Sequence, residues 1–173
     1  PGVGCACERR VGPKGDGGKW VCNPDDLLRS PCAVLSVGSN NDFRFEQAMA
    51  AYGCHVHVYD HTSNPPVVWR GDVLPPDGRY MTREGASRVT FFKQALGTFD
   101  TALTVTVATA VRRLITATGA PAVDVFKLDC EGCEFSALTT YAAATTLARG
   151  VRQLAVELHF NLGTPGASWF GVQ

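Results

Sequence analysis

Hydrophobic residues along this chain follow two alternating patterns: short continuous runs, and groups spaced three or four residues apart. Short runs bounded by turn residues are typical of buried strands, whereas the wider spacing is typical of one face of a helix. The runs predict five strands, at 33–37, 56–59, 89–94, 123–128 and 151–158. The wider spacing predicts three helices, at 45–52, at 102–118 and through Phe135, Leu138 and Ala142.

Turn and capping residues separate these predicted elements. Asp42 can cap the first helix, Gly53 can end it, and Gly119 can end the second helix. The stretch 61–88 contains two Pro-Pro pairs, which interrupt both strand and helix patterns. We therefore predict a long loop there.

Strands that alternate with helices predict an α/β fold with a mostly parallel sheet and helices on both of its faces. In such sheets, ligands bind outside the carboxyl ends of the strands. Four features of the chain are expected to meet at that edge: the turn after the first strand, Asp60 after the second, Asp129 after the fourth, and Glu157 with His159 at the fifth. The abrupt change from an apolar strand to the acidic stretch 129–134 makes the fourth strand end the main candidate for function.

Composition narrows the range of partners. The chain has 173 residues, 45% of them hydrophobic and 18% charged, which suits one soluble globular domain at 33–173 preceded by a cap segment at 1–32. The formal net charge is zero and the basic residues are scattered, so nucleic acid is not expected as a partner. No apolar stretch approaches the roughly 20 residues that a transmembrane helix needs. The oligomeric state stays open.

Seven cysteines are many for a chain of this size. Four of them lie in the amino-terminal part, at 5, 7, 22 and 32, where a disulfide or a zinc site could stabilise a segment with little core. Because their spacing lacks paired C-x-x-C knuckles, a disulfide involving Cys22 is the better prediction. Cys130 and Cys133 form a C-x-x-C, but their acidic neighbours disfavour thiolates. We predict that these two pack as small side chains in the first turn of a helix.

The turn after the first strand indicates the kind of ligand. A dinucleotide fold uses G-x-G-x-x-G to wrap a pyrophosphate, and this turn keeps only Gly38 of the three glycines. Asp42 would also repel a phosphate, so a cofactor with an adenosine but no phosphates fits better. Asp60 follows Gly38 by 22 residues, about the spacing at which an acidic residue reaches ribose hydroxyls. The alternatives are a plain tight turn for Gly38 and a solvated strand end for Asp60.

Four ordered blocks of the chain resemble the FkbM-related methyltransferases, especially the methyltransferase-like 24 type. The blocks are D-G-G-K-W-V-C at 16–22, V-G-S-N-N-D-F at 37–43, F-K-L-D-C-E-G-C-E at 126–134 and E-L-H at 157–159. The third block is the most specific, because it matches the family's K-[IL]-D-x-E-G-x-E signature at 127, 129, 131, 132 and 134. The resemblance implies a Rossmann-like, class I methyltransferase domain that uses S-adenosylmethionine.

The resemblance also implies roles for individual residues. The methionine end of the cofactor would lie on Gly38, Ser39 and Asn40, and its ribose on Asp60. The adenine would approach the segment Gln94, Ala95 and Leu96, and Asp129 would face the methyl-transfer centre.

The amino-terminal block around Lys19 allows two interpretations. It is either a turn that buries Trp20 in the core or a lid over the cofactor. In the second case Lys19 would pair with the methionine carboxylate, which is a charge-assisted contact.

Methyl transfer to oxygen or nitrogen needs mainly proximity and a base for the acceptor proton. The candidate catalytic residues are Asp129, Glu131 and His159, and a histidine has the pKa best suited to base work near neutral pH. The alternative for His159 is a buried ring bonded to Glu157 or to a backbone carbonyl. Asp129, Glu131 and Glu157 could instead hold a divalent cation, whereas Glu134 is expected only to complement a helix dipole.

The sequence therefore predicts S-adenosylmethionine-dependent O-methylation of a small molecule, a glycan or a secreted acceptor. An NAD-dependent oxidoreductase and an inactive methyltransferase fold that serves as a binding module are the alternatives. The stretch 161–173 looks like a loop, and only fourteen residues follow His159, so the last two strands of a complete class I domain are expected to be missing. The cysteines and the resemblance favour the secretory pathway or the extracellular space over the cytoplasm.

Overall fold

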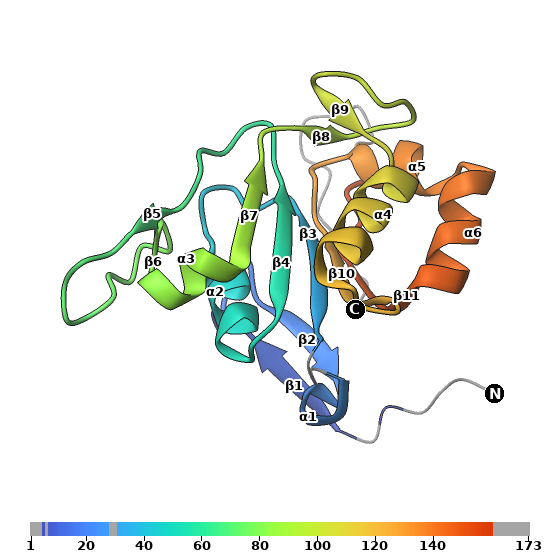
Figure 1. Ribbon diagram of the computed structural model, residues 1–173. Coiled ribbons are helices and arrows are strands. Elements are labelled where there is room, and N and C mark those ends of the chain that lie inside the picture. Colours follow the sequence, from blue (N-terminus) through green and yellow to red (C-terminus); the bar gives the residue numbers. More distant parts are fainter. Residues whose placement is uncertain (1–4, 6, 28–30, 161–173) are drawn as a thin grey trace.

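The computed structural model describes residues 5, 7–27 and 31–160. Its centre is a five-stranded, fully parallel sheet in the order β11-β10-β3-β4-β7 (Figure 1). The strands are β3 (Ala33–Val37), β4 (His55–Tyr59), β7 (Val89–Phe92), β10 (Val123–Leu128) and β11 (Val151–Val156). The predicted α/β fold with a parallel sheet is confirmed. The expected loop at 161–173 and the expected absence of later strands lie outside the described residues.

Apolar side chains cover both faces of the sheet because successive strand residues point to opposite sides. On one face, Leu35 and Phe126 pack with Leu114 of α4 (Val107–Thr118) and with α5 (Cys133–Leu138) and α6 (Tyr141–Gly150). On the other, Val34 and Val58 pack against α2 (Arg44–Ala51). Figure 1 shows α4, α5 and α6 grouped at one side of the sheet, and α2 with α3 (Arg83–Arg88) at the other.

Several predicted boundaries were wrong. The helix predicted at 102–118 begins only at Val107, because β9 (Thr104–Val105) pairs with β8 (Ala95–Leu96) before Thr106 caps the helix. The helix predicted through Phe135, Leu138 and Ala142 is divided into α5 and α6, since the Thr140 hydroxyl accepts a hydrogen bond from Ala143 N and starts a new helix.

The predicted loop and the predicted helix cap also need correction. The stretch 61–88 contains α3 and two short paired strands, β5 (Val67–Val68) and β6 (Tyr80–Met81). Phe43 rather than Asp42 is the N-cap of α2, and the Asp42 carboxylate pairs with Arg44 instead. Gly53 follows α2 with a φ of +90°, as a helix-ending glycine does.

The amino-terminal segment forms a hairpin of β1 (Glu8–Val11) and β2 (Lys19–Cys22), followed by α1 (Pro24–Leu27). Val11 and Val21 join the core beneath α2. A Cys5–Cys22 disulfide confirms the predicted pairing of Cys22. A second disulfide, Cys32–Cys54, joins the chain just before β3 to the chain just before β4. No helix in the described part of the chain has both the length and the apolar character that crossing a membrane requires.

A charged pair is buried under the turn that follows β3. Lys127 of β10 is 2% exposed and Glu46 of α2 is fully buried, and the Lys127 Nζ lies 3.7 Å from Glu46 Oε1. Lys127 donates a hydrogen bond to the carbonyl of Gly38, and Glu46 accepts one from Ser36. The pair and its hydrogen bonds thus connect β3, β10 and α2 with the turn that follows β3.

We predict that Glu46→Gln destabilises the protein by about 3–5 kcal/mol, because it leaves the Lys127 ammonium buried without a counter-charge. The free energy of unfolding from urea titration under non-reducing conditions measures this loss. A double variant, Glu46→Leu with Lys127→Met, should lose less than the single variant, since it buries no charge. A single variant as stable as the wild type would contradict this prediction.

Candidate functional site

A cavity of about 860 Å³ opens at the carboxyl edge of the sheet. Its walls come from the segments that follow β3, β4, β10 and β11, from β8, and from the hairpin turn between β1 and β2. Of the predicted site residues, the cavity is lined by Gly38, Ser39, Asn40, Asp60, Ala95, Leu96, Asp129, Glu131 and His159. Features predicted from four separate strand ends therefore belong to one cavity.

The floor of the cavity lies where the backbone at Gly38 packs closely against the backbone at Asp129. Gly38 follows β3 with a φ of +79°, and a Cβ at this position would lie 1.6 Å from the carbonyl oxygen of Asp129. The Asp129 amide donates to the carbonyl of Val37 at 3.0 Å, and the Gly38 amide donates to the carbonyl of Tyr59 at 3.0 Å. β3 and β10 are neighbours in the sheet but not in sequence, so the cavity lies at the topological switch point where α/β folds bind ligands.

Asp60 organises the turn that lies above this floor. One carboxylate oxygen accepts hydrogen bonds from the Ser39 and Asn40 amides and from the hydroxyls of Ser39 and Ser63. The other accepts from the Thr62 and Ser63 amides and from the Thr62 hydroxyl. Because a carboxylate has about four lone-pair sites, these seven donors occupy both oxygens. A ribose that bound to Asp60 would have to displace some of these donors.

Burial alone would raise the pKa of Asp60, which is 5% exposed. Hydrogen bonds from Ser63, Thr62 and Ser39 outweigh that effect and hold the pKa far below the ordinary aspartate value. The carboxylate is therefore ionised at neutral pH, and the turn is ordered around its negative charge.

Lys19 of β2 is not among the residues that line the cavity, but it contacts two residues that do. Its Nζ lies 2.9 Å from Asp129 Oδ2 and 2.6 Å from Glu157 Oε2. Burial lowers the pKa of Lys19, but the hydrogen bonds to these two carboxylates raise it above the ordinary lysine value. The ammonium predicted to meet a methionine carboxylate is thus engaged with protein carboxylates. Trp20 is 45% exposed, so the first of the two interpretations of this block, in which Trp20 is buried in the core, does not hold.

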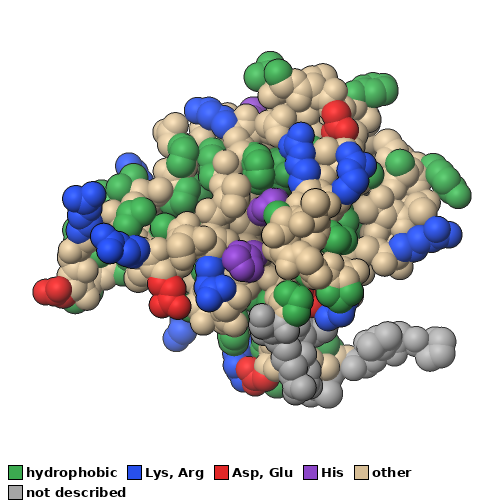
Figure 2. All heavy atoms as spheres, viewed as in Figure 1, with side chains coloured by type: hydrophobic (Ala, Val, Ile, Leu, Met, Phe, Trp, Pro, Cys, Tyr) green, Lys and Arg blue, Asp and Glu red, His purple; other side chains and the backbone are tan. Residues whose placement is uncertain are grey.

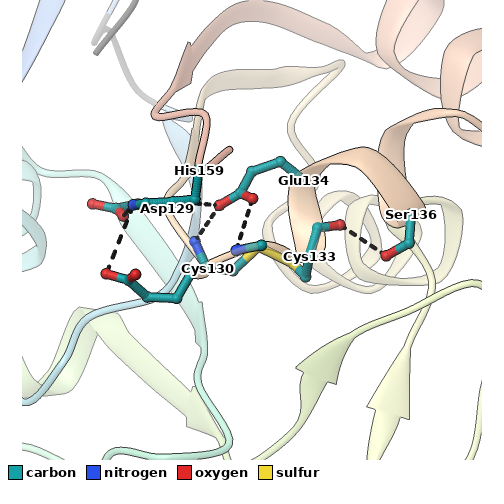
Figure 3. Close-up of a disulfide and its surroundings, with 8 residues drawn as sticks. Asp129, Cys130, Cys133, Glu134, Ser136 and His159 are labelled. Atoms are coloured by element: carbon teal, nitrogen blue, oxygen red, sulfur yellow. Dashed lines mark hydrogen bonds and ion pairs between the residues drawn. A yellow bond between two sulfur atoms is a disulfide. The ribbon is translucent and has the colours of Figure 1, made fainter. Parts of the chain in front are cut away.

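His159 lies between two sets of carboxylates. Its Nδ1 is 2.8 Å from Oε1 of Glu134, which is fully buried (Figure 3). Its Nε2 is 3.7 Å from Asp129 Oδ1 and 3.7 Å from Glu131 Oε1. Burial lowers the pKa of His159, but the bond to Glu134 and the charges of Glu131 and Asp129 raise it above the ordinary histidine value.

Glu134 was predicted only to complement a helix dipole, but in the structure it also makes specific hydrogen bonds. Its two oxygens accept hydrogen bonds from the amides of Cys130 and Gly132, both at 2.9 Å, in addition to the contact with His159. The buried carboxylate therefore fixes both the strand-end loop and the histidine ring. His159 Nε2 lies 4.0 Å from Glu157 Oε1, so Glu134 is a closer partner of the ring than the predicted alternative, Glu157.

Two overlapping groups of side chains have the spacing of metal ligands. Ligand atoms of Asp129, Glu131 and His159 lie within 4.8 Å of one another, as do those of Asp16, Asp129 and Glu157. Carboxylate oxygens and an imidazole nitrogen suit divalent cations, and Glu134 behind His159 is placed as an outer carboxylate that orients a ligand histidine. Among the described residues, neither group is the one predicted from sequence, which combined Asp129 and Glu131 with Glu157.

The far wall of the cavity contains two of the three residues predicted near adenine. Ala95 and Leu96 line it, whereas Gln94 does not. The Gln94 side chain instead donates to the carbonyls of Thr101 and Ala102 and accepts from Arg113, which stabilises the connection between β8 and β9. Gln94 therefore has a structural role outside the cavity, whereas Ala95 and Leu96 form part of its apolar wall.

The cysteine pair in the signature was predicted wrongly. Cys130 and Cys133 form a disulfide, with a Cα to Cα distance of 5.5 Å, and both line the cavity. The acidic neighbours of these cysteines disfavour a reactive thiolate, but they do not destabilise a disulfide that has already formed. Asp16 also lines the cavity, but it was not among the predicted site residues. It lies in a hairpin turn, and the sequence does not indicate where that turn packs.

Comparison with known proteins gives one match. The model of the family Methyltransf_22, described as a methyltransferase domain, matches residues 1–168. No curated protein and no solved structure matches the chain. The matched span includes every segment that lines the cavity.

We predict that Asp60→Asn lowers the melting temperature by roughly 4–8 °C at pH 7, because the uncharged amide cannot accept all seven hydrogen bonds. The low folded-state pKa of Asp60 means that its stabilisation is complete above the unfolded value of about 4 and is lost as the pH falls toward the folded value. The difference between variant and wild type should therefore shrink at pH 3. Melting curves at both pH values test this, and an equal or larger difference at pH 3 would contradict it.

Proposed function

The chain belongs to the Methyltransf_22 family of methyltransferase domains, and we propose that it transfers a methyl group from S-adenosylmethionine to an oxygen of its acceptor. The acceptor class we propose is a small molecule or a glycan. Within the methyltransferases, the signature block 126–134 supports a place among the FkbM-related members. The family match also favours a methyltransferase over a nicotinamide oxidoreductase.

The proposal rests on one observation, that the turn at Gly38–Asp42 and the side-chain cluster of Asp129 and His159 line the same cavity. The turn at Gly38–Asp42 has one glycine and two carboxylates near it, which suits an adenosine without phosphates better than a dinucleotide. The Asp129–His159 cluster lies at the adjacent strand end and supplies anionic and basic groups for an acceptor hydroxyl. A donor site and a proton-accepting site therefore share one space.

The bound donor would supply a sulfonium methyl group, which an acceptor oxygen takes by in-line displacement. Gly38, Ser39 and Asn40 are proposed for its methionine end, and Ala95 with Leu96 for its adenine. Asp60 holds the turn that forms this wall, and we propose that it contacts the ribose only if the Ser39 or Ser63 donors move. Lys19 is proposed to exchange a carboxylate partner for the methionine carboxylate.

His159 is the proposed base for the acceptor proton. Glu134 accepts from Nδ1, which favours the tautomer with its lone pair on Nε2, toward Asp129 and Glu131. A raised pKa strengthens the ring as a base, and the neighbouring carboxylates stabilise the imidazolium that forms. Asp129 and Glu131 are proposed to orient the acceptor hydroxyl, because carboxylates accept hydrogen bonds from it.

A divalent cation on Asp129, Glu131 and His159 is the second way in which this cluster could serve methyl transfer. Such an ion would lower the pKa of an acceptor hydroxyl directly. Chelation separates the two: activity that survives EDTA assigns the cluster to base work, and activity that is lost and then restored by Mg²⁺ assigns it to cation binding.

Compartment and partners are part of the proposal. Three disulfides, of which Cys32–Cys54 is buried, support a secretory-pathway or extracellular location over the cytoplasm. On the face shown in Figure 2, lysine and arginine side chains lie among hydrophobic and uncharged ones, which supports an acceptor other than nucleic acid.

Binding of S-adenosylhomocysteine tests the cofactor assignment. Isothermal titration calorimetry should give a saturable signal with S-adenosylhomocysteine and with S-adenosylmethionine, and none with NAD. No heat with either sulfur compound would overturn the methyltransferase proposal. Binding without methyl transfer to any member of a panel of glycans and small hydroxyl compounds would favour an inactive fold that serves as a binding module.

We predict that His159→Gln lowers kcat for methyl transfer by about 10²–10⁴-fold, because the acceptor proton loses its base. The dissociation constant of S-adenosylhomocysteine should change by no more than about threefold, since that wall of the cavity keeps its residues. Radiolabel transfer and calorimetry measure the two quantities. His55→Gln is the matched control, because His55 is an exposed histidine at the start of β4, away from the cavity. Equal activity in both variants would remove His159 from the mechanism.

A further inference from the structure

The Cys130–Cys133 disulfide forms part of the wall of the proposed methyl-transfer site. It directly follows Asp129 (Figure 3). It encloses Glu131 and Gly132 in a four-residue loop that connects β10 to α5. Both half-cystines line the cavity and both are partly exposed. A reagent that enters the cavity therefore meets this bond.

The loop closed by the disulfide has an unusual backbone. Glu131 has a φ of +58° and Gly132 a φ of +113°. Glycine adopts positive φ readily, but a residue with a Cβ is strained there, so Glu131 needs a constraint from its surroundings. The covalent link across the loop is such a constraint, and it acts directly on the residue that bears a catalytic carboxylate.

The same loop is connected to His159 by hydrogen bonds through Glu134. The amides of Cys130 and Gly132 donate to the two oxygens of Glu134, and one of these oxygens contacts the His159 ring. A change in the loop conformation thus moves Glu131 directly and the histidine through one buried carboxylate. The turn at Gly38 and the wall at Leu96 belong to other segments and do not depend on it.

The other two disulfides have different surroundings. Cys32 and Cys54 are 1% and 0% exposed in the core beneath α2. Cys5 and Cys22 join the amino-terminal segment to β2, and neither lines the cavity. Among the disulfides of the described residues, the one at 130–133 alone combines access from the cavity with a link to the proposed catalytic groups.

We propose that the Cys130–Cys133 disulfide positions Asp129, Glu131 and His159, and that its reduction by a dithiol switches methyl transfer to a low rate. This rests on the proposed function. A thiolate of the dithiol attacks one sulfur and breaks the S–S bond, and its second thiolate then displaces the protein sulfur from the mixed disulfide. The protein gains two electrons and two protons as two thiols, and the dithiol becomes a cyclic disulfide.

The experiment compares the oxidised protein with protein treated with dithiothreitol, in a Cys7→Ser background that removes the exposed free thiol at Cys7. Alkylation and peptide mass mapping identify which disulfides have opened. We expect kcat to fall about 10- to 100-fold once Cys130 and Cys133 are reduced, because small displacements of reacting groups have effects of this size. The dissociation constant of S-adenosylhomocysteine should change by less than about threefold.

Two double variants serve as controls. Cys130→Ser with Cys133→Ser should have the low kcat of the reduced protein and no further response to dithiothreitol. Cys5→Ser with Cys22→Ser should keep the full response. Reduced protein that retains its kcat within about twofold, with both thiols mapped, would overturn the proposal, as would an equal response in the serine variant at 130 and 133.

Hydrogen exchange distinguishes a failure of this inference from a failure of the proposed function. Reduction should speed the exchange of the Cys130 and Gly132 amides, which are bonded to Glu134. If the oxidised protein neither binds S-adenosylhomocysteine nor transfers methyl groups, the proposed function fails, and this exchange alone decides whether the disulfide orders the loop. Unchanged exchange after reduction would overturn the ordering role in either case.

Discussion

The close approach of Gly38 to Asp129 is the constraint on which the whole site depends. The two residues are 91 positions apart, yet the space for a Cβ on one is filled by the carbonyl of the other. This packing requires β3 and β10 to be adjacent and parallel, and it brings the turn after the first core strand against the acidic end of the fourth. The cavity is a consequence of that crossover, because the segments following these strands diverge to opposite faces of the sheet.

Several acidic side chains crowd this edge, and each of the central ones has its own means of support. Asp60 is held by seven hydrogen-bond donors, Asp129 by Lys19, and Glu134 by two amides and His159. Because the donors differ, the carboxylates have different functions. Asp60 orders a turn, Glu134 orders a loop and a ring, and Asp129 with Glu131 faces the open space. The surroundings thus divide similar side chains into those that order the backbone and those that line the cavity.

The elements themselves could be predicted well where pattern alone decides them. All five core strands were predicted, because parallel strands buried on both faces appear as continuous apolar runs. The prediction failed where a contact distant in sequence decides: β8 pairs with β9 and delays α4, and the short strands and helix at 61–88 are formed despite their prolines. The residues predicted at the strand ends do line one cavity, but the contacts of Glu134 and Gln94 were not predicted, since each depends on partners that no local spacing reveals.

The sequence by itself determined the α/β class, the strand ends that line the cavity and the signature block that contains Asp129 and Glu131, because these follow from local periodicity and residue type. Tertiary structure alone decided which acids are satisfied and which face the cavity. Glu134 meets His159 across 25 residues, Lys19 meets Glu157 across 138, and Cys130 bonds to Cys133 in a loop whose backbone brings their sulfurs together. The contacts of Glu134 and Lys19 depend on the packing of segments that are distant in sequence, whereas the Cys130–Cys133 bond depends on the backbone conformation of one loop.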